Sequence, residues 1–150
     1  MVIYKSREHN DYTIIIGWGR LGASLAASLS NRKKNVSIID KNKEAFRKLS
    51  PSFGGLTLEG DATYIDILKE AEIDKSTVVI LVTNNDNTNI MIAQMVKELF
   101  GIKTVIARLY DPERECVYKE FNIDTICPSI LSANKIDELL NIKNGESIYA

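Results

Sequence analysis

The sequence predicts an α/β fold in which six parallel strands form one doubly wound sheet. Short apolar runs alternate six times with helix-favouring segments over 150 residues, a length that fits one domain. A glycine turn, Gly17-Trp18-Gly19-Arg20-Leu21-Gly22, follows the first apolar run directly, and the second run ends on Asp40. Because strand–helix–strand units close by right-handed crossovers, we expect the strand order 3-2-1-4-5-6.

The first strand–turn–helix–strand unit has the clearest pattern. Tyr12 to Ile16 is mostly apolar, as expected of a strand buried on both faces, and a helix is expected from about Arg20 to Asn31. The turn between them matches G-x-G-x-x-G, the fingerprint of Rossmann-like nucleotide-binding folds. In this pattern Gly17 allows the tight turn, Gly19 lets the backbone approach a pyrophosphate, and Gly22 lets the helix pack close to the sheet.

Asp40 follows the second predicted strand, Val36 to Ile39. It lies about 20 residues after the glycine turn, where the fingerprint places an acid that hydrogen-bonds a ribose diol. Asp40 is also a suitable N-cap for the next helix, and the two roles can coexist.

Turns and cap residues separate the remaining elements. We expect further strands at Leu56 to Leu58, Thr77 to Val82, Lys103 to Arg108 and Asp124 to Cys127. We expect further helices at Asn42 to Leu49, Tyr64 to Ala71, Asp86 to Phe100, after Asp111-Pro112, and at about Ile130 to Asn141. Asp86 is the predicted N-cap of the long helix and Gly101 its C-terminal glycine, while Asp61 or Thr63 caps the helix from Tyr64. Residues 1–11 are predicted as a lead-in, 12–142 as the nucleotide-binding domain and 143–150 as a tail.

Composition excludes several classes of function. The chain is 45% hydrophobic and 26% charged with a net charge of −1, which favours a globular protein without a nucleic-acid or anionic-membrane partner. No apolar run approaches the roughly 18 residues of a membrane span, and no apolar signal region opens the chain, so a cytoplasmic location is expected. Cys116 and Cys127 fit neither a CxxC pair nor a zinc pattern, so no metal site is predicted.

The carboxyl ends of the central strands are the expected ligand site, because turns converge there at the switch point of a doubly wound sheet. The second turn supplies Lys41 beside Asp40, and the third places Asp61 and Ala62 at the adenine edge. Thr83, Asn84 and Asn85 of the fourth turn offer polar groups near the phosphates or a second ribose. These turn residues also have an alternative reading as ordinary caps.

Three larger side chains flank this site. Trp18 is expected to be exposed, with only its backbone N–H in reach of a ligand. Arg20 either folds back onto a terminal phosphate or extends into solvent, and Arg108 must reach the site rim or a partner because it ends an apolar strand. The candidate binding residues are therefore Gly17, Trp18, Gly19, Arg20, Leu21, Gly22, Asp40, Lys41, Asp61, Ala62, Thr83, Asn84, Asn85 and Arg108.

An oxidoreductase is the first alternative for such a fold, beside a free-standing nucleotide-binding protein. A small NAD-dependent enzyme needs a substrate pocket and an acid–base group near the nicotinamide. The sequence covers one nucleotide-binding unit, its only histidine is His9 in the lead-in, and no tyrosine is followed by lysine four residues later. We therefore expect no catalytic residues.

The motifs together resemble the N-terminal lobe of the RCK or KTN domain, the TrkA-N family, which regulates prokaryotic potassium channels and transporters. The matching residues span about Tyr12 to Leu140 and are Ile15 to Gly22, Ile39-Asp40, Gly60 to Thr63, Thr83 to Asp86 with Asn89, Ala107-Arg108, and Pro128. The resemblance implies a sensor of an adenine nucleotide, NAD(H) or ATP, ADP or AMP, that assembles into dimers and rings. It also implies a membrane partner, a potassium transporter or channel subunit, through which the protein associates peripherally with the membrane.

The same resemblance assigns roles and shows departures. It implies that Asp40 holds the ribose and that Asp61 and Ala62 flank the adenine. The sequence stops at the helix that would lead into the family's usual C-terminal lobe, so that lobe is not expected within these residues. Some members carry a glutamate for a metal beside ATP where this sequence has Ser129, so metal-linked ATP sensing is not expected.

Two helices carry apolar residues beyond what one sheet face needs. Seven apolar residues cover roughly 200° of the helix from Asp86 to Phe100, against the roughly 100° that packing on a sheet requires. Either another subunit or a neighbouring helix of the same chain covers the excess. The last helix, with Ile136, Leu139 and Leu140, is either a docking or exchange element or packs on its own sheet.

Overall fold

The structure is a computed structural model that describes residues 11–143. Its centre is a six-stranded parallel sheet in the order β3-β2-β1-β4-β5-β6, which confirms the predicted topology. The strands are β1 (Tyr12–Ile16), β2 (Asn35–Asp40), β3 (Leu56–Glu59), β4 (Val78–Leu81), β5 (Thr104–Arg108) and β6 (Asp124–Ile126). Most of the predicted lead-in and tail, including His9, lies outside the described residues.

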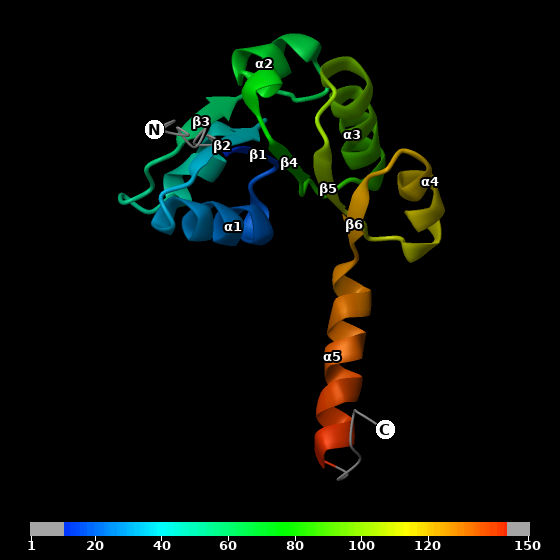
Figure 1. The fold of residues 1–150 in the computed structure, drawn as a ribbon. Coiled ribbons are helices and arrows are strands. Elements are labelled where there is room, and N and C mark those ends of the chain that lie inside the picture. The colour runs from blue at the N-terminus through cyan, green and yellow to red at the C-terminus, as the bar shows by residue number, and fades with distance from the viewer. Residues whose placement is uncertain (1–10, 144–150) are drawn as a thin grey trace, which may run out of the picture.

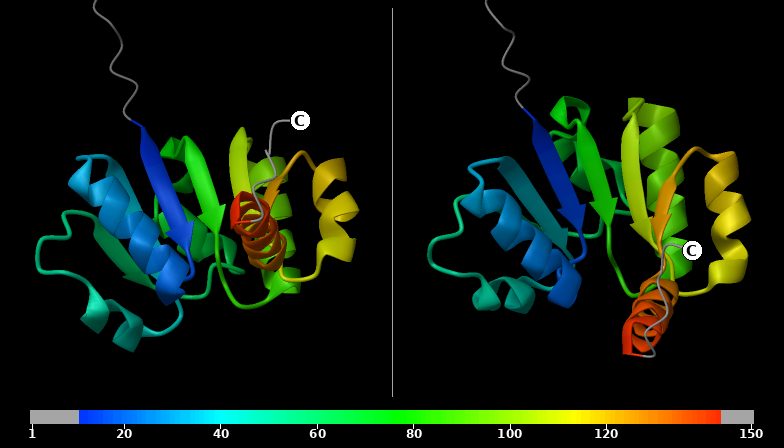
Figure 2. Two further views of the ribbon diagram at one scale, coloured as in Figure 1. Left: turned by 90° about the horizontal axis from the view of Figure 1, so that it is seen from below. Right: turned by 60° about the horizontal axis from the view of Figure 1, so that its bottom comes forward.

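Helices lie on both faces of this sheet (Figures 1 and 2). The α-helices are α1 (Gly19–Asn31), α2 (Ile65–Glu70), α3 (Asp86–Phe100), α4 (Glu115–Glu120) and α5 (Pro128–Lys143). Short 3₁₀ helices are η1 (Lys43–Lys48), η2 (Ile73–Lys75) and η3 (Pro112–Arg114). The helix α1 covers one face, while α2, α3 and α4 cover the other.

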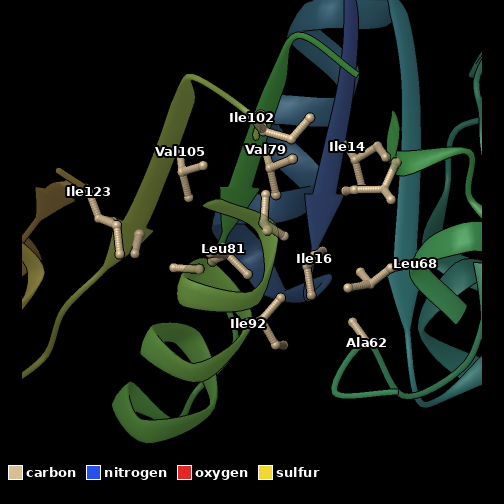
Figure 3. Packing of buried hydrophobic residues seen from close by; sticks show 14 of the residues in the cluster. Ile14, Ile16, Ala62, Leu68, Val79, Leu81, Ile92, Ile102, Val105 and Ile123 are labelled. Atoms are coloured by element: carbon tan, nitrogen blue, oxygen red, sulfur yellow. The ribbon is translucent and has the colours of Figure 1, made fainter. Parts of the chain in front are cut away.

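The central strand β1 buries both of its faces, as predicted. Along β1, Ile14 and Ile16 pack in the larger cluster under α2, α3 and α4, whereas Ile15 packs in the smaller cluster under α1. Figure 3 shows the larger cluster, with Ile16, Ile92 and Ala62 close together at one end. This end lies at the carboxyl edge of the sheet, where the core forms the floor of the candidate site.

The residues that cap three helices differ from those predicted. Asn85 rather than Asp86 caps α3, because Oδ1 of Asn85 accepts from the N–H of Thr88 at 2.9 Å. The carboxylate of Asp86 is occupied by the N–H groups of Tyr110 and Asp111, at 2.9 and 3.0 Å. Asp61 and Thr63 do not cap α2, which begins at Ile65 without a side-chain cap. Similarly, Asn42 rather than Asp40 caps η1.

Two of the apolar residues that α3 carries beyond what packing on the sheet requires remain exposed. Ile92, Ala93 and Val96 are buried, but Met91 is 43% and Leu99 57% exposed. No neighbouring helix within residues 11–143 covers these two side chains, so the intrachain explanation fails for them.

The helix α5 projects away from the rest of the domain (Figure 1). Ile136, Leu139 and Leu140 are each between 47% and 58% exposed, so the predicted alternative of packing on its own sheet is wrong. Within the described part of the chain, no helix is long and apolar enough to cross a membrane.

Candidate functional site

A pocket of about 270 Å³ opens at the carboxyl ends of β1, β2, β3 and β4. Apolar residues that end these strands or lie on α3 form its floor, and polar turn residues form its rim. The lining residues are Ile16, Gly17, Trp18, Gly19, Ile39, Asp40, Lys41, Gly60, Asp61, Ala62, Val82, Thr83, Asn84, Asn85, Thr88 and Ile92. The four turns predicted to converge do so.

The glycine turn is shaped by backbone contacts. Gly17 has φ +95°, and a Cβ there would lie 2.8 Å from the Thr83 nitrogen. A Cβ on Gly22 would lie 2.5 Å from the Gly17 carbonyl oxygen, so Gly22 allows α1 to pack against the turn itself. Gly19 has φ +40°, and a Cβ there would meet nothing within 4 Å. Gly17 and Gly22 therefore serve packing, whereas Gly19 faces open space at the pocket.

Asp40 joins the first two turns. Its Oδ2 accepts from the backbone N–H of Trp18 at 2.8 Å, and its Oδ1 accepts from the N–H of Asn42 at 2.8 Å. Each carboxylate oxygen has a second lone pair, so the side chain can still accept from a ligand hydroxyl. The acid therefore fixes the entrance of the pocket and keeps acceptor capacity toward it.

An ion pair joins the second and third turns. Lys41 Nζ lies 3.3 Å from Asp61 Oδ2, while Asp61 Oδ1 accepts from the N–H and the hydroxyl of Thr63 at 2.9 and 2.7 Å. Desolvation raises the pKa of Asp61, but the hydrogen bonds from Thr63 and Lys41 outweigh it and hold this pKa below its ordinary value. The carboxylate form of Asp61 thus orders the third turn.

The fourth turn is held from outside the pocket. Arg108 Nη2 donates to the carbonyls of Val82 and Thr83 at 2.8 and 3.0 Å and to Oδ1 of Asn84 at 3.1 Å. Its guanidinium lies 4.9 Å from the ring centre of Tyr110, and its buried Nε has no hydrogen-bond partner. Through Nη2, Arg108 holds the fourth turn, and it does not line the pocket.

The structure brings most predicted site residues together and separates a few. Arg20 is exposed, and Leu21 packs against the apolar cluster under α1. Neither of them lines the pocket, nor do Gly22 and Arg108. The expectation that Trp18 is exposed is wrong, because its side chain is 7% exposed and packs in that same cluster. As ligand contacts, all of these residues stay predictions.

Six lining residues were not predicted: Ile16, Ile39, Gly60, Val82, Thr88 and Ile92. The strand-end residues carried a usable signal, because the last apolar residue of a central parallel strand must border a site at that edge. Thr88 and Ile92 could be placed at the pocket only once the position of α3 relative to the sheet was known, and the sequence of its first turn does not determine that position.

A six-stranded sheet of this order with a pocket at its switch point defines a Rossmann-like domain. Residues 13–128 match the TrkA-N domain. The chain belongs to the TrkA-N domain family, which confirms the resemblance found in its motifs.

Known relatives agree with this assignment. The chain is 38% identical over 138 residues to the Trk system potassium uptake protein TrkA of Streptomyces coelicolor, covering 92% of this chain and 62% of that protein. The crystal structure of the GsuK RCK domain superposes with a TM-score of 0.76 at 28% identity, over 90% of this chain and 29% of that one. Other GsuK structures of the same identity contain ADP or NAD. The TrkA-N domain of Escherichia coli ybaL superposes with a TM-score of 0.77 at 19% identity, over 87% of this chain and 96% of that one, and supports the fold.

Proposed function

We propose that this chain is an adenine-nucleotide-sensing regulatory domain of a potassium uptake system or channel. The observation that carries the proposal is the pocket in which Asp40 and the glycine turn meet, joined by the Trp18–Asp40 hydrogen bond of 2.8 Å. Support comes from GsuK, of which structures bound to ADP and to NAD are known, and from the TrkA potassium uptake protein.

The pocket suggests where each part of the ligand binds. The phosphates would lie over Gly19, at the N-terminal end of α1, where the helix dipole favours an anion. The ribose would lie at Asp40, and the adenine between the third turn and the floor formed by Ile16 and Ile92. ADP, AMP, ATP and NAD(H) share these parts, so the proposal is an adenine nucleotide.

The proposed role is regulatory and not catalytic. Polar groups of the pocket hold its walls: Lys41 pairs with Asp61, and Thr83 bonds Asn89. The exposed residues Met91 and Leu99 of α3 fit an interface with a second copy, and the exposed helix α5 fits docking or exchange. Bound nucleotide would change the geometry of this homo-oligomer. The oligomer would then act on a membrane potassium transporter or channel, with which the protein associates from the cytoplasm.

Two measurements test ligand binding. Mass spectrometry of the native protein should detect a co-purified adenine nucleotide, and calorimetry with ATP, ADP, AMP, NAD and NADH should show saturable binding of at least one. A protein that binds none of them contradicts the proposal. Turnover of alcohols, aldehydes or hydroxy acids with NAD(H) that disappears in Gly19→Ala would instead identify an enzyme.

The regulatory part has its own test. Pull-down from the membrane fraction, with and without nucleotide, should recover an ion-transport component, and small-angle scattering should differ between the two conditions. If no such component is recovered and nucleotide leaves the scattering profile unchanged, the domain only binds nucleotide.

A further inference from the structure

The strongest unexplained feature is a polar side chain in the core, Asn89 on α3. It is 0% exposed and lies one turn before the buried residues Ile92 and Ala93. Burying an amide is unfavourable unless its hydrogen bonds are made, so an apolar residue would suit this position if packing were its only role.

All hydrogen-bonding capacity of this amide goes to two residues. Oδ1 of Asn89 accepts from the backbone N–H of Thr83 at 3.2 Å and from its hydroxyl at 2.5 Å. Nδ2 donates to the carbonyls of Thr83 and Arg108 at 3.2 and 3.0 Å. An amide has two donors and two acceptor lone pairs, and here each has a partner.

The Asn89 amide makes the hydrogen bonds to the Thr83 backbone that a neighbouring strand would make within a sheet. β4 ends at Leu81, so Thr83 lies beyond the regular ladder, yet its N–H and C=O both bond one side-chain amide. The bond to the Arg108 carbonyl ties the same amide to the end of β5. Thr83 is therefore held at a fixed distance from two strand ends.

The position of Thr83 also determines that of the glycine turn. A Cβ on Gly17 would lie 2.8 Å from the Thr83 nitrogen and 2.9 Å from the Val82 carbonyl carbon, so the two backbones are in direct contact. A shift of Thr83 toward Gly17 would therefore displace the glycine turn. The buried Asn89 amide, together with the Arg108 guanidinium that also donates to the Thr83 carbonyl, thereby holds two walls of the pocket, the glycine turn and the fourth turn.

We infer that Asn89 is a positioning residue that sets nucleotide affinity through Thr83 and Gly17 without touching the ligand. The inference rests on the proposed function for the identity of the ligand, but the positioning itself is a property of the protein alone. It predicts that loss of the amide loosens the Thr83 backbone even in the absence of nucleotide.

The variants are Asn89→Asp, Asn89→Leu and a control, Val96→Ala. Asn89→Asp keeps the shape but turns a carboxylate oxygen toward the carbonyls of Thr83 and Arg108, and Asn89→Leu removes all of the bonds. Val96 is also 0% exposed on α3 but lies outside the pocket, so its truncation lowers stability without disturbing Thr83. Affinity for ADP and NAD is measured by calorimetry, and exchange of the Thr83 amide by NMR on ligand-free protein.

We expect both Asn89 variants to weaken nucleotide binding by at least about tenfold. The Thr83 amide should also exchange faster in these two variants than in Val96→Ala. Val96→Ala itself should bind nucleotide with the wild-type affinity. Lowering the pH should bring the nucleotide affinity of Asn89→Asp closer to that of the wild type, because a protonated carboxyl regains one hydrogen-bond donor. If Asn89→Leu does not fold, Asn89→Asp decides alone.

Failure of the proposed function and failure of the positioning role would give different results. A wild-type protein that binds none of the nucleotides overturns the proposed function, and the exchange rates then decide the positioning role. Thr83 exchange in the Asn89 variants equal to that in Val96→Ala overturns the positioning role. Faster exchange with unchanged affinity overturns the link from positioning to binding.

Discussion

The backbone N–H of Trp18 donates to Oδ2 of Asp40 at 2.8 Å, between residues 22 positions apart in the sequence. The bond connects the glycine turn after β1 to the end of β2, and the other oxygen of Asp40 accepts from Asn42. Asp40 therefore has a structural task besides the one proposed toward the ribose. Its substitution should affect both stability and binding, in proportions that can be measured separately.

Asp40→Ala should weaken NAD binding by at least about tenfold and lower the free energy of unfolding by about 1–3 kcal/mol, because two backbone N–H groups lose a charged acceptor. In the wild type, NADP should bind more weakly than NAD, because its 2′-phosphate would face the Asp40 carboxylate. Calorimetry and urea unfolding measure the two effects. Asp124→Ala is the control, an exposed acid on the edge strand β6. Equal affinities for NADP and NAD, or unchanged binding in Asp40→Ala, would contradict this role.

The glycines of the turn should separate folding from binding. Gly17→Ala and Gly22→Ala should each destabilise by about 1–3 kcal/mol, since their Cβ atoms would clash with the backbone at 2.8 and 2.5 Å. Gly19→Ala has free space around its Cβ and should cost no more than about 1–2 kcal/mol for its positive φ. Because that Cβ would project where the phosphates are proposed to lie, Gly19→Ala should lose nucleotide affinity while staying folded. Thermal unfolding and calorimetry on the three variants test this, and Gly19→Ala with wild-type affinity would remove the glycine turn from the proposed phosphate site.

The sequence predicted the sheet because its signals are local. Each strand is a short apolar run, and the glycine turn and Asp40 follow their strands directly, so topology rules placed them at one edge. The boundaries of β1 and α3 and the αL glycine Gly101 were correct for the same reason.

The roles of several polar side chains could not be predicted, because they depend on contacts between residues far apart in the sequence. Asp86 looked like a helix cap but bonds Tyr110 and Asp111, which lie 24 and 25 positions away. Arg108 was expected to reach the site rim or a partner, and only the fold shows that its guanidinium bonds the carbonyls of Val82 and Thr83. The sequence shows which hydrogen-bond donors and acceptors a side chain has, whereas only the fold shows which groups they bond.

The outer surface of α3 should be an interface between copies of the chain. Leu99 is 57% exposed, and Leu99→Glu places a charge on that surface without entering the core. Light scattering should show at least a dimer for the wild type and a smaller species for Leu99→Glu. Ser24→Glu, which adds the same charge to an exposed position of α1, should leave the mass unchanged. A wild-type monomer at micromolar concentration would exclude this interface.

Tyr118 joins α4 to the start of α3 and should make the fold sensitive to alkaline pH. Its hydroxyl donates to the Asp86 carbonyl at 2.8 Å, and its side chain is 0% exposed. Burial, together with the nearby Asp86 charge, raises the pKa of Tyr118 to about 12. The ordinary value of a tyrosine, near 10, applies to the unfolded chain.

The direction of the effect follows from these two values. The neutral phenol stabilises the native state fully below about pH 10, and this contribution is lost as the pH rises toward about 12. Tyr118→Phe should therefore be about 1 kcal/mol less stable than wild type at pH 8, for the lost hydrogen bond, and should lose less stability than wild type between pH 10 and about 11.5. Urea unfolding at each pH measures both quantities, with Tyr64→Phe, at a 66% exposed position, as the control. Parallel pH curves for Tyr118→Phe and wild type would show that the buried hydroxyl does not titrate with folding. The bond to Asp86 would then be the only contribution of the Tyr118 hydroxyl to stability.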